Sequence, residues 1–206
     1  MDFSLYLVTD RKATLGRPLL PLLEECLAAG VKAVQLREKD LSGRELYELA
    51  AGLRTLTRQH GARLLINDRI DIALAVDADG VHLPSDSFPP EEARRLVGPG
   101  KLIGVSTHSL DEAKAAQKEG AEFIVFGPIF DTPSKREYGA PLGVDLLSRV
   151  AASVSIPVFA IGGVKAASVR KLRESGAGGV AVISAVLGAQ SPATAVKELL
   201  EAWQAA

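Results

Sequence analysis

The chain has 206 residues, of which 47% are apolar, and its formal net charge at neutral pH is −1. This length fits one domain with a sizeable core, so we expect residues 1–206 to form a single domain. The nearly balanced charge excludes a strong global field of either sign, and we expect neither nucleic acid nor a membrane as a partner. The single cysteine, Cys26, rules out an internal disulfide framework and predicts a cytoplasmic protein.

Residues 1–10 contain no basic segment followed by the apolar run that a secretion signal needs. No stretch of the sequence is apolar over the length that a membrane-spanning helix requires. Both observations favour a soluble protein. The oligomeric state stays open at this point, with a homo-oligomer among the alternatives.

A short apolar run, a polar or glycine-bearing turn and an amphipathic helix recur in this order along the chain. We predict strands at Leu5–Thr9, Ala33–Arg37, Arg63–Ile66, Gly80–Leu83, Leu102–Ser106, Phe123–Phe126, Val158–Ile161 and Gly179–Ile183. We predict helices at Leu19–Ala29, Gly43–His60, Ile70–Ala75, Pro90–Val97, Leu110–Glu119, Val144–Ala152, Val169–Ser175 and Ala193–Ala202.

Signals at the helix ends support these predictions. Ser109 and Glu112 have the spacing of a capping box, and Pro90 suits the first turn of a helix. Glycine readily adopts the positive φ that often ends a helix. Such a glycine stands just past four of the predicted helices, at Gly30, Gly61, Gly120 and Gly176.

Eight consecutive strand–helix units predict parallel strands joined by right-handed crossovers. Eight such units close into a (β/α)8 barrel, or TIM barrel, that is smaller than the common size of about 250 residues. The alternative is an open doubly wound sheet, which usually has a glycine-rich turn after its first strand. The corresponding turn here, Thr9–Arg11, contains no glycine. We therefore expect the barrel.

Polar side chains follow most of the predicted strands, at the end of a barrel where active sites lie. Gln35, Arg37 and Lys39 are spaced two apart, so in a strand they share one face. A cationic face in a parallel strand is costly unless an anion meets it, although an edge strand with a solvated face would show the same pattern. In a barrel these three residues would form one wall of an anion site.

Other strand ends add to this interpretation. Gly162–Gly163 and Ser184 follow the last two strands, where many barrels bind phosphate, although a tight turn would explain the glycine pair equally well. Lys135, after the sixth strand, adds a positive charge. Asn67 and Asp68 supply the amide and carboxylate oxygens that suit Mg²⁺, while Asp68 is also well placed to cap the next helix.

The histidines give weaker signals. His82 ends the fourth strand, where it either faces the barrel mouth or is a core imidazole with its hydrogen bonds satisfied. His108 opens a helix, where a structural role is at least as good an explanation as a catalytic one. No cluster of cysteine and histidine indicates zinc.

Taken together, the motifs resemble the thiamin phosphate synthase and thiazole tautomerase family over nearly the whole chain. The segments that carry the resemblance are Tyr6–Asp10, Gln35–Lys39, Leu65–Arg69, Gly80–Leu83, Gly104–Ser109, Phe126–Phe130, Thr132–Lys135, Ala160–Gly163 and Val180–Ser184. The family fold is the barrel expected above. Its synthases join a hydroxymethylpyrimidine diphosphate to a thiazole phosphate and release diphosphate.

The resemblance also implies roles for individual positions. It assigns the pyrimidine diphosphate to Gln35, Arg37, Lys39, Asn67, Ser106 and Lys135. It assigns the thiazole phosphate to Thr132, Pro133, Ser134, Gly163, Ile183 and Ser184. Asp68 would bind Mg²⁺, and Arg37, Lys39 and Lys135 would be catalytic because they disperse the charge that grows on the leaving diphosphate.

One position departs from the synthase pattern. The family's synthases carry a second Mg²⁺ carboxylate at the position that is Ser87 here, and Asp86, one residue earlier, is the candidate substitute. The segment around Ser87 is instead similar to that of the tautomerases, which isomerise a thiazole carboxylate phosphate without a metal. Tautomerases tend to lose the Asn67–Asp68 pair and to have histidine in place of Pro128. Synthase is therefore the leading hypothesis, with a tautomerase and a non-catalytic binder of thiamin precursors as alternatives.

Overall fold

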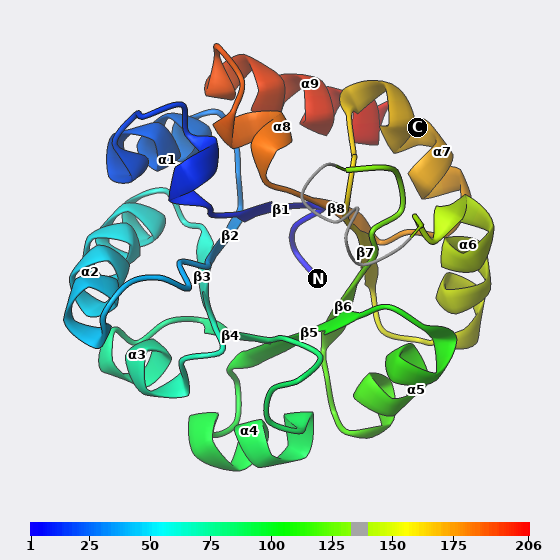
Figure 1. The fold of residues 1–206 in the computed structure, drawn as a ribbon, viewed down its shortest axis with the longest axis horizontal. Coiled ribbons are helices and arrows are strands. Elements are labelled where there is room, and N and C mark those ends of the chain that lie inside the picture. Colours follow the sequence, from blue (N-terminus) through cyan, green and yellow to red (C-terminus); the bar gives the residue numbers. More distant parts are fainter. Residues whose placement is uncertain (133–139) are drawn as a thin grey trace.

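The computed structural model of the chain describes residues 1–132 and 140–206. Eight parallel strands form a closed barrel in the order of the sequence, with helices around the outside (Figure 1). The predicted (β/α)8 barrel is confirmed, and the open doubly wound sheet is wrong, because β1 pairs with β8 through Leu5–Val180, Tyr6–Ala181 and Leu7–Val182. Within the described residues, no helix is long and apolar enough to cross a membrane.

The strands lie within one or two residues of their predicted bounds. They are β1 (Leu5–Val8), β2 (Ala33–Leu36), β3 (Arg63–Asn67), β4 (Gly80–Leu83), β5 (Leu102–Thr107), β6 (Phe123–Phe126), β7 (Val158–Ala160) and β8 (Gly179–Val182). The predicted second strand is one residue too long, because Arg37 already lies beyond β2. This difference affects the site described below.

The helices also follow the prediction, with two additions. They are α1 (Leu19–Ala28), α2 (Gly43–Gln59), α3 (Ile70–Ala75), α4 (Pro90–Val97), α5 (Leu110–Lys118), α6 (Gly143–Ser153), α7 (Ala166–Glu174), α8 (Ser184–Leu187) and α9 (Pro192–Gln204). A 3₁₀ turn, η1 (Arg11–Ala13), and α8 were not predicted, because each is too short to show a periodic pattern. The predicted seventh helix begins three residues too late.

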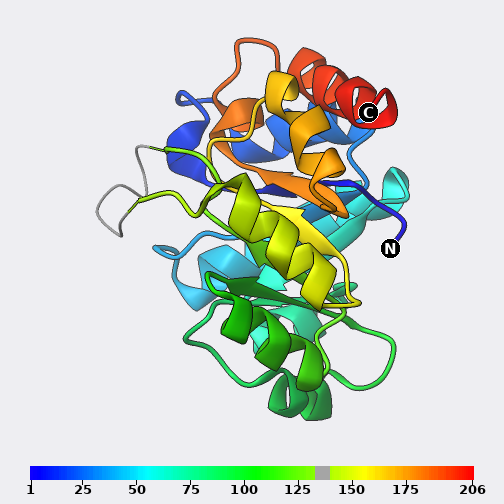
Figure 2. The same cartoon turned by 90° about the vertical axis from the view of Figure 1, so that its right-hand side faces the viewer.

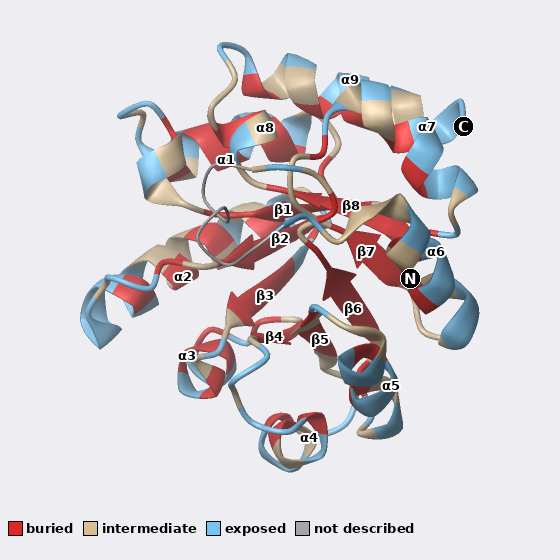
Figure 3. Cartoon of the chain, turned by 45° about the vertical axis from the view of Figure 1, so that its right-hand side comes forward, coloured by how far each residue is buried: buried red, intermediate tan, exposed pale blue. Residues whose placement is uncertain are grey.

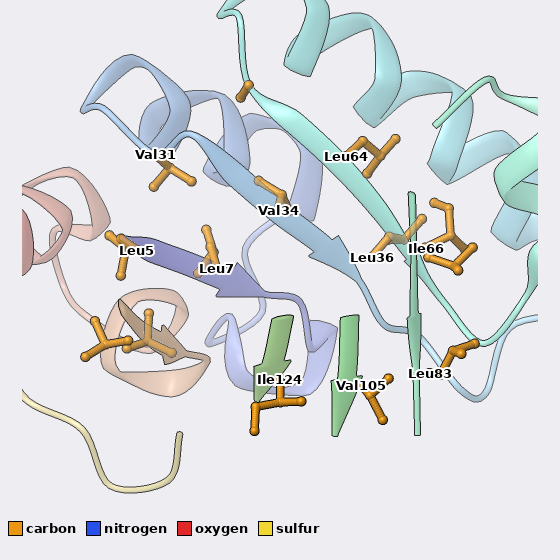
Figure 4. Close-up of a cluster of buried hydrophobic side chains, with 14 of the residues drawn as sticks. Leu5, Leu7, Val31, Val34, Leu36, Leu64, Ile66, Leu83, Val105 and Ile124 are labelled. Atoms are coloured by element: carbon orange, nitrogen blue, oxygen red, sulfur yellow. The ribbon is translucent and has the colours of Figure 1, made fainter. Parts of the chain in front are cut away.

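Outward-facing side chains of the strands pack against the helices. Leu5 and Leu7 on β1, Val34 and Leu36 on β2 and Leu64 on β3 belong to one buried cluster in this layer (Figure 4). Each helix turns a buried face inward and an exposed face to solvent (Figure 3). Burial of this apolar layer, at roughly 25 cal/mol per Å², supplies the main favourable free energy of folding.

The inside of the barrel is filled by aromatic side chains. Phe3, Tyr6, Phe123 and Phe159 are buried there, and the ring centroids of Phe3 and Phe159 are 5.3 Å apart. The N-terminal segment lies within the ring of strands in Figure 1 and at the opposite end of the barrel from η1 in Figure 2. The aromatic packing therefore closes the N-terminal end, and the polar residues lie at the other end.

Candidate functional site

The second strand brings one polar side chain inside the barrel and then leaves the sheet. Gln35 is 2% exposed, lies on the inner face of β2 and donates a hydrogen bond from Nε2 to the Tyr6 hydroxyl at 3.2 Å. Arg37 follows the strand, and its backbone N–H donates to Thr9 Oγ1 at 2.8 Å. Lys39 is exposed in the connection to α2. The three residues therefore follow one strand end, but only Gln35 is a strand residue.

An ion pair between a buried carboxylate and a half-exposed arginine shapes the loop that carries these cations. Glu38 is 7% exposed, and its carboxylate accepts hydrogen bonds from the backbone N–H of Arg11 at 3.2 Å and from Arg11 Nε at 3.1 Å. Arg11 also pairs with Asp40 at 2.9 Å. The side chains of Arg37 and Lys39 have no hydrogen bond or ion pair with any residue in the described ranges. Arg11 is thus used structurally, while two positive charges at the same strand end stay free for a ligand.

Asn67 and Asp68 end the neighbouring strand β3. Asp68 has φ = +63°, and its backbone N–H donates to the His82 carbonyl of β4 at 2.9 Å. The Asp68 carboxylate is exposed, and its Oδ1 accepts a hydrogen bond from the Ser87 hydroxyl. The alternative role of Asp68 as a helix cap is wrong, because the N-cap of α3 is Arg69 and no side chain caps that helix.

The described residues do not contain a preformed metal cage. Within ranges 1–132 and 140–206, no group of three or more histidine, cysteine, aspartate or glutamate side chains could hold a metal ion. Ser87, not Asp86, contacts Asp68, and Asp86 is exposed one residue away. One carboxylate with a neighbouring amide and hydroxyl fits Mg²⁺, since this ion keeps several waters and commonly takes the rest of its oxygens from substrate phosphates. Asp86 as a second ligand stays a prediction.

His82 and Ser106 continue the polar layer on β4 and β5. His82 Nε2 lies 2.9 Å from Ser106 Oγ, and the imidazole is 2% exposed. Burial, together with the positive charge of Arg37, lowers the pKa of His82 to about 3, so the ring is neutral at physiological pH. Gln35, Asn67, His82 and Ser106 therefore form one arc across four adjacent strands.

A glycine pair follows β7 and lies against the connection after β6. Gly162 and Gly163 have φ values of +94° and +66°, and a Cβ at Gly163 would lie 2.7 Å from the Asp131 carbonyl oxygen. The Phe130 N–H donates to the Gly162 carbonyl at 3.0 Å, which holds the two connections together. Close backbone approach thus requires glycine here, as the tight-turn interpretation proposed. Phosphate binding at this pair stays a prediction.

The remaining predicted thiazole-phosphate residues follow β6 and β8 or lie beyond the described ranges. Ile183 is half-buried at the end of β8, Ser184 is exposed and begins α8, and Thr132 is half-buried after β6. Pro133, Ser134 and Lys135 lie outside the described residues.

Sequence reasoning missed two members of the site. Tyr6 lies in an apolar run that predicts only a strand, and the pairing of Arg11 with Glu38 joins residues 27 positions apart. For His82 the sequence allows two roles, and the structure buries the imidazole on the inner face of the barrel with Nε2 bonded to Ser106 Oγ, while Nδ1 has no partner within the described residues. The signal for Tyr6 was its alternation with Val8, which places both residues on the inner face of β1.

The fold and the polar layer define the class of protein: a (β/α)8 barrel with its candidate site at the carboxyl ends of the strands. The chain belongs to the thiamine monophosphate synthase family, whose sequence pattern matches residues 5–186. A Geobacter sulfurreducens protein, provisionally named thiamine-phosphate synthase, is 53% identical over 97% of this chain and 94% of its own length. Thiamine-phosphate synthase of Moorella thermoacetica is 46% identical over 97% of this chain and 95% of that protein.

The solved structures agree with the sequence relatives. Thiamine phosphate pyrophosphorylase from Pyrococcus furiosus superposes with a TM-score of 0.90 at 39% identity, covering 98% of this chain and 96% of that one. The similarity therefore extends over the whole barrel, including every strand end that contributes to the site.

Proposed function

We propose that the protein is a thiamin phosphate synthase, a transferase that couples hydroxymethylpyrimidine diphosphate to thiazole phosphate with release of diphosphate. The observation that carries the proposal is a pair of cations, Arg37 and Lys39, next to the strand end that bears Asp68; within residues 1–132 and 140–206 their side chains have no hydrogen bond or ion pair. Relatives named thiamine-phosphate synthase, at 41–46% identity over almost the full chain, support the same activity.

The proposed reaction breaks the bond between the pyrimidine methylene carbon and the diphosphate oxygen, and the electron pair leaves with diphosphate. The thiazole nitrogen then forms the new bond to that carbon, so no strong protein base is needed. Arg37, Lys39 and Lys135 stabilise the negative charge that develops on the leaving group. Gln35, Asn67 and Ser106 orient the pyrimidine, and holding both rings in line supplies a further part of the rate.

Magnesium is part of this proposal. Asp68 would hold the ion together with the substrate diphosphate, and Asp86 is the candidate second carboxylate. When bound, the ion would neutralise charge on the diphosphate oxygens. Gly163, Ile183, Ser184 and the segment Thr132–Ser134 would hold the thiazole phosphate, whose oxygens accept hydrogen bonds from backbone N–H groups and hydroxyls.

A thiazole tautomerase is the second candidate, and one observation favours it. Ser87 occupies the position of the synthases' second carboxylate and donates its hydroxyl proton to Asp68. An isomerisation would need a proton donor and acceptor at the thiazole. His82 does not suit that role, because its neutral ring is buried on the opposite side of the barrel from β7 and β8.

The deciding experiment supplies purified protein with both precursor phosphates, with and without Mg²⁺. A synthase releases diphosphate and forms thiamin phosphate only when the metal is present, and no product at high enzyme concentration would overturn the proposal. Loss of the dearomatised thiazole absorbance without Mg²⁺ would identify a tautomerase instead. Thermal stabilisation by either precursor without turnover would indicate a binding protein.

A further inference from the structure

The His82 imidazole is held firmly on the inner face of β4. Its ring centroid lies 5.8 Å from that of Tyr6 and 5.9 Å from that of Phe123. Its one hydrogen bond within the described residues joins Nε2 to Ser106 Oγ. The ring therefore has a fixed orientation, with one nitrogen directed at a residue of the candidate site.

The other ring nitrogen, Nδ1, has no partner in the described part of the chain, although it is fully buried. It faces Gly104 on the adjacent strand, where a Cβ would lie only 2.7 Å from Nδ1. This contact leaves no space for another polar group on that side. A neutral imidazole has one N–H and one bare nitrogen, so the proton lies either on Nε2, facing Ser106, or on Nδ1, facing Gly104.

The two tautomers differ in which hydrogen-bonding group remains without a partner. A proton on Nδ1 would be a buried N–H donor without an acceptor, which is rare in folded proteins. A proton on Nε2 leaves only a bare acceptor at Nδ1 and gives Ser106 Oγ a donor. In that arrangement the serine oxygen accepts from His82, and its own proton is not used within the protein.

From this geometry we infer that His82 is a positioning residue which carries its proton on Nε2 and turns the Ser106 hydroxyl proton toward the bound pyrimidine diphosphate. The inference rests on the proposed function, since it assigns Ser106 a direction toward that substrate. Ser106 would then act as an obligatory donor to an acceptor atom of the substrate.

The tautomer can be measured on the wild-type protein without any activity assay. In protein labelled with ¹⁵N at its three histidines, long-range proton–nitrogen spectra distinguish a protonated from a bare ring nitrogen. We expect His82 to show a protonated Nε2 and a bare Nδ1, with the signals assigned by their loss in His82→Gln. A proton on Nδ1, or a doubly protonated ring at pH 7, would overturn the inference.

Steady-state kinetics tests the consequence for the substrate. His82→Phe keeps an aromatic ring but removes the donor, so KM for hydroxymethylpyrimidine diphosphate should rise about tenfold, with kcat within about twofold and KM for thiazole phosphate unchanged. His82→Gln, whose amide can donate to Ser106, should recover most of this loss. A fall in kcat together with similar rises in both KM values would indicate a merely structural role.

A double variant separates the positioning role from an independent one. Ser106→Ala should raise the same KM, and adding His82→Phe to it should cause little further change, because both substitutions remove one interaction. Additive effects would contradict the inference. If the wild-type protein forms no thiamin phosphate, the proposed function fails, whereas the tautomer measurement still decides the role of His82 at Ser106.

Discussion

At the scale of single residues, the site is distinguished by charges that the fold does not use. Glu38, which follows β2, forms an ion pair with Arg11 of η1, so the fold already provides a partner for this cation. Arg37 and Lys39 have no such partner within the described ranges. A residue that contributes nothing to folding can be replaced without loss of stability, and this separates a functional cation from a structural one.

Arg37→Met should therefore reduce activity far more than stability. We expect kcat/KM for the pyrimidine diphosphate to fall by roughly 100-fold or more, because a preorganised charge at the leaving group is lost. The midpoint of urea unfolding should change little. Lys114→Met on α5, an exposed lysine remote from the strand ends, is the matched control and should leave both quantities unchanged. Equal effects of the two substitutions would show that Arg37 does not contact the substrate.

The contact between Ser87 and Asp68 leads to a second prediction at this scale. Ser87→Asp adds a carboxylate next to Asp68, so we expect half-maximal activity at a several-fold lower Mg²⁺ concentration. Without metal, repulsion between the two carboxylates should lower the melting temperature, and added Mg²⁺ should restore it. Ser87→Asn, which is similar in size but uncharged, is the control. A Mg²⁺ response identical in both variants would place the metal elsewhere.

The role of Asp86 is independent of that of Ser87, so the Mg²⁺ titration is repeated with a variant at Asp86. If Asp86 substitutes for the second carboxylate, Asp86→Ala should raise the Mg²⁺ concentration that gives half-maximal activity. Asp111→Ala on α5 removes another exposed carboxylate, one that is not predicted to bind the metal, and serves as the control. If this Mg²⁺ concentration is unchanged in Asp86→Ala, Asp86 does not bind the ion, and of the two aspartates only Asp68 is a ligand.

At the scale of elements, the connection after β7 can be tested by a glycine substitution. A Cβ at Gly163 would lie 2.7 Å from both the Asp131 oxygen and Phe130 Cβ, in a residue with φ = +66°. We expect Gly163→Ala to lower the free energy of unfolding by about 1–3 kcal/mol and to raise KM for thiazole phosphate. Gly100→Ala is the control, since its φ is +83° but nothing lies within 4 Å of its Cβ. If both variants lose equal stability, backbone strain alone is responsible.

The order of elements could be predicted from the sequence because each strand and helix has its own local pattern. Short apolar runs, glycines past helix ends and the Ser109–Glu112 pair can each be recognised within a few residues of sequence. The site could be predicted from the sequence only in part. The strand ends located Gln35, Arg37 and Asp68, but the burial of Glu38 depends on Arg11, which approaches it only after β1 and β2 have paired.

Contacts between side chains that are distant in the sequence determine the parts of the site that could not be predicted. The sequence places Asp86 and Ser87 next to each other, and only the folded loop determines which one meets Asp68. Likewise, His82 could be assigned to a strand, but its neutral state depends on Tyr6, Phe123 and Gly104 from three other strands. Long-range contacts of this kind have no local signature.

At the scale of the whole molecule, the buried imidazole couples folding to pH. The pKa of His82 is lowered from an ordinary value of 6.5 to about 3, so between these values the unfolded chain binds a proton that the folded chain does not. Stability therefore rises with pH through this window and is fully present above about pH 6.5, with a slope of at most about 1.4 kcal/mol per pH unit. Ion-pair partners lower the pKa of carboxylates such as Asp2 and Asp77. These groups change stability only as the pH falls through and below their ordinary pKa of 3.8.

Unfolding in urea between pH 7 and pH 5 therefore isolates the contribution of His82. The wild-type free energy of unfolding should fall across this range, and His82→Gln, which cannot be protonated, should show a flatter curve. Ser106→Ala is the matched control, because it removes the hydrogen bond but retains the buried imidazole, and its curve should keep most of the wild-type slope. Parallel curves for the wild type and His82→Gln would mean that the imidazole gains its proton without unfolding, which the packing of Tyr6 and Phe123 around it and the positive charge of Arg37 oppose.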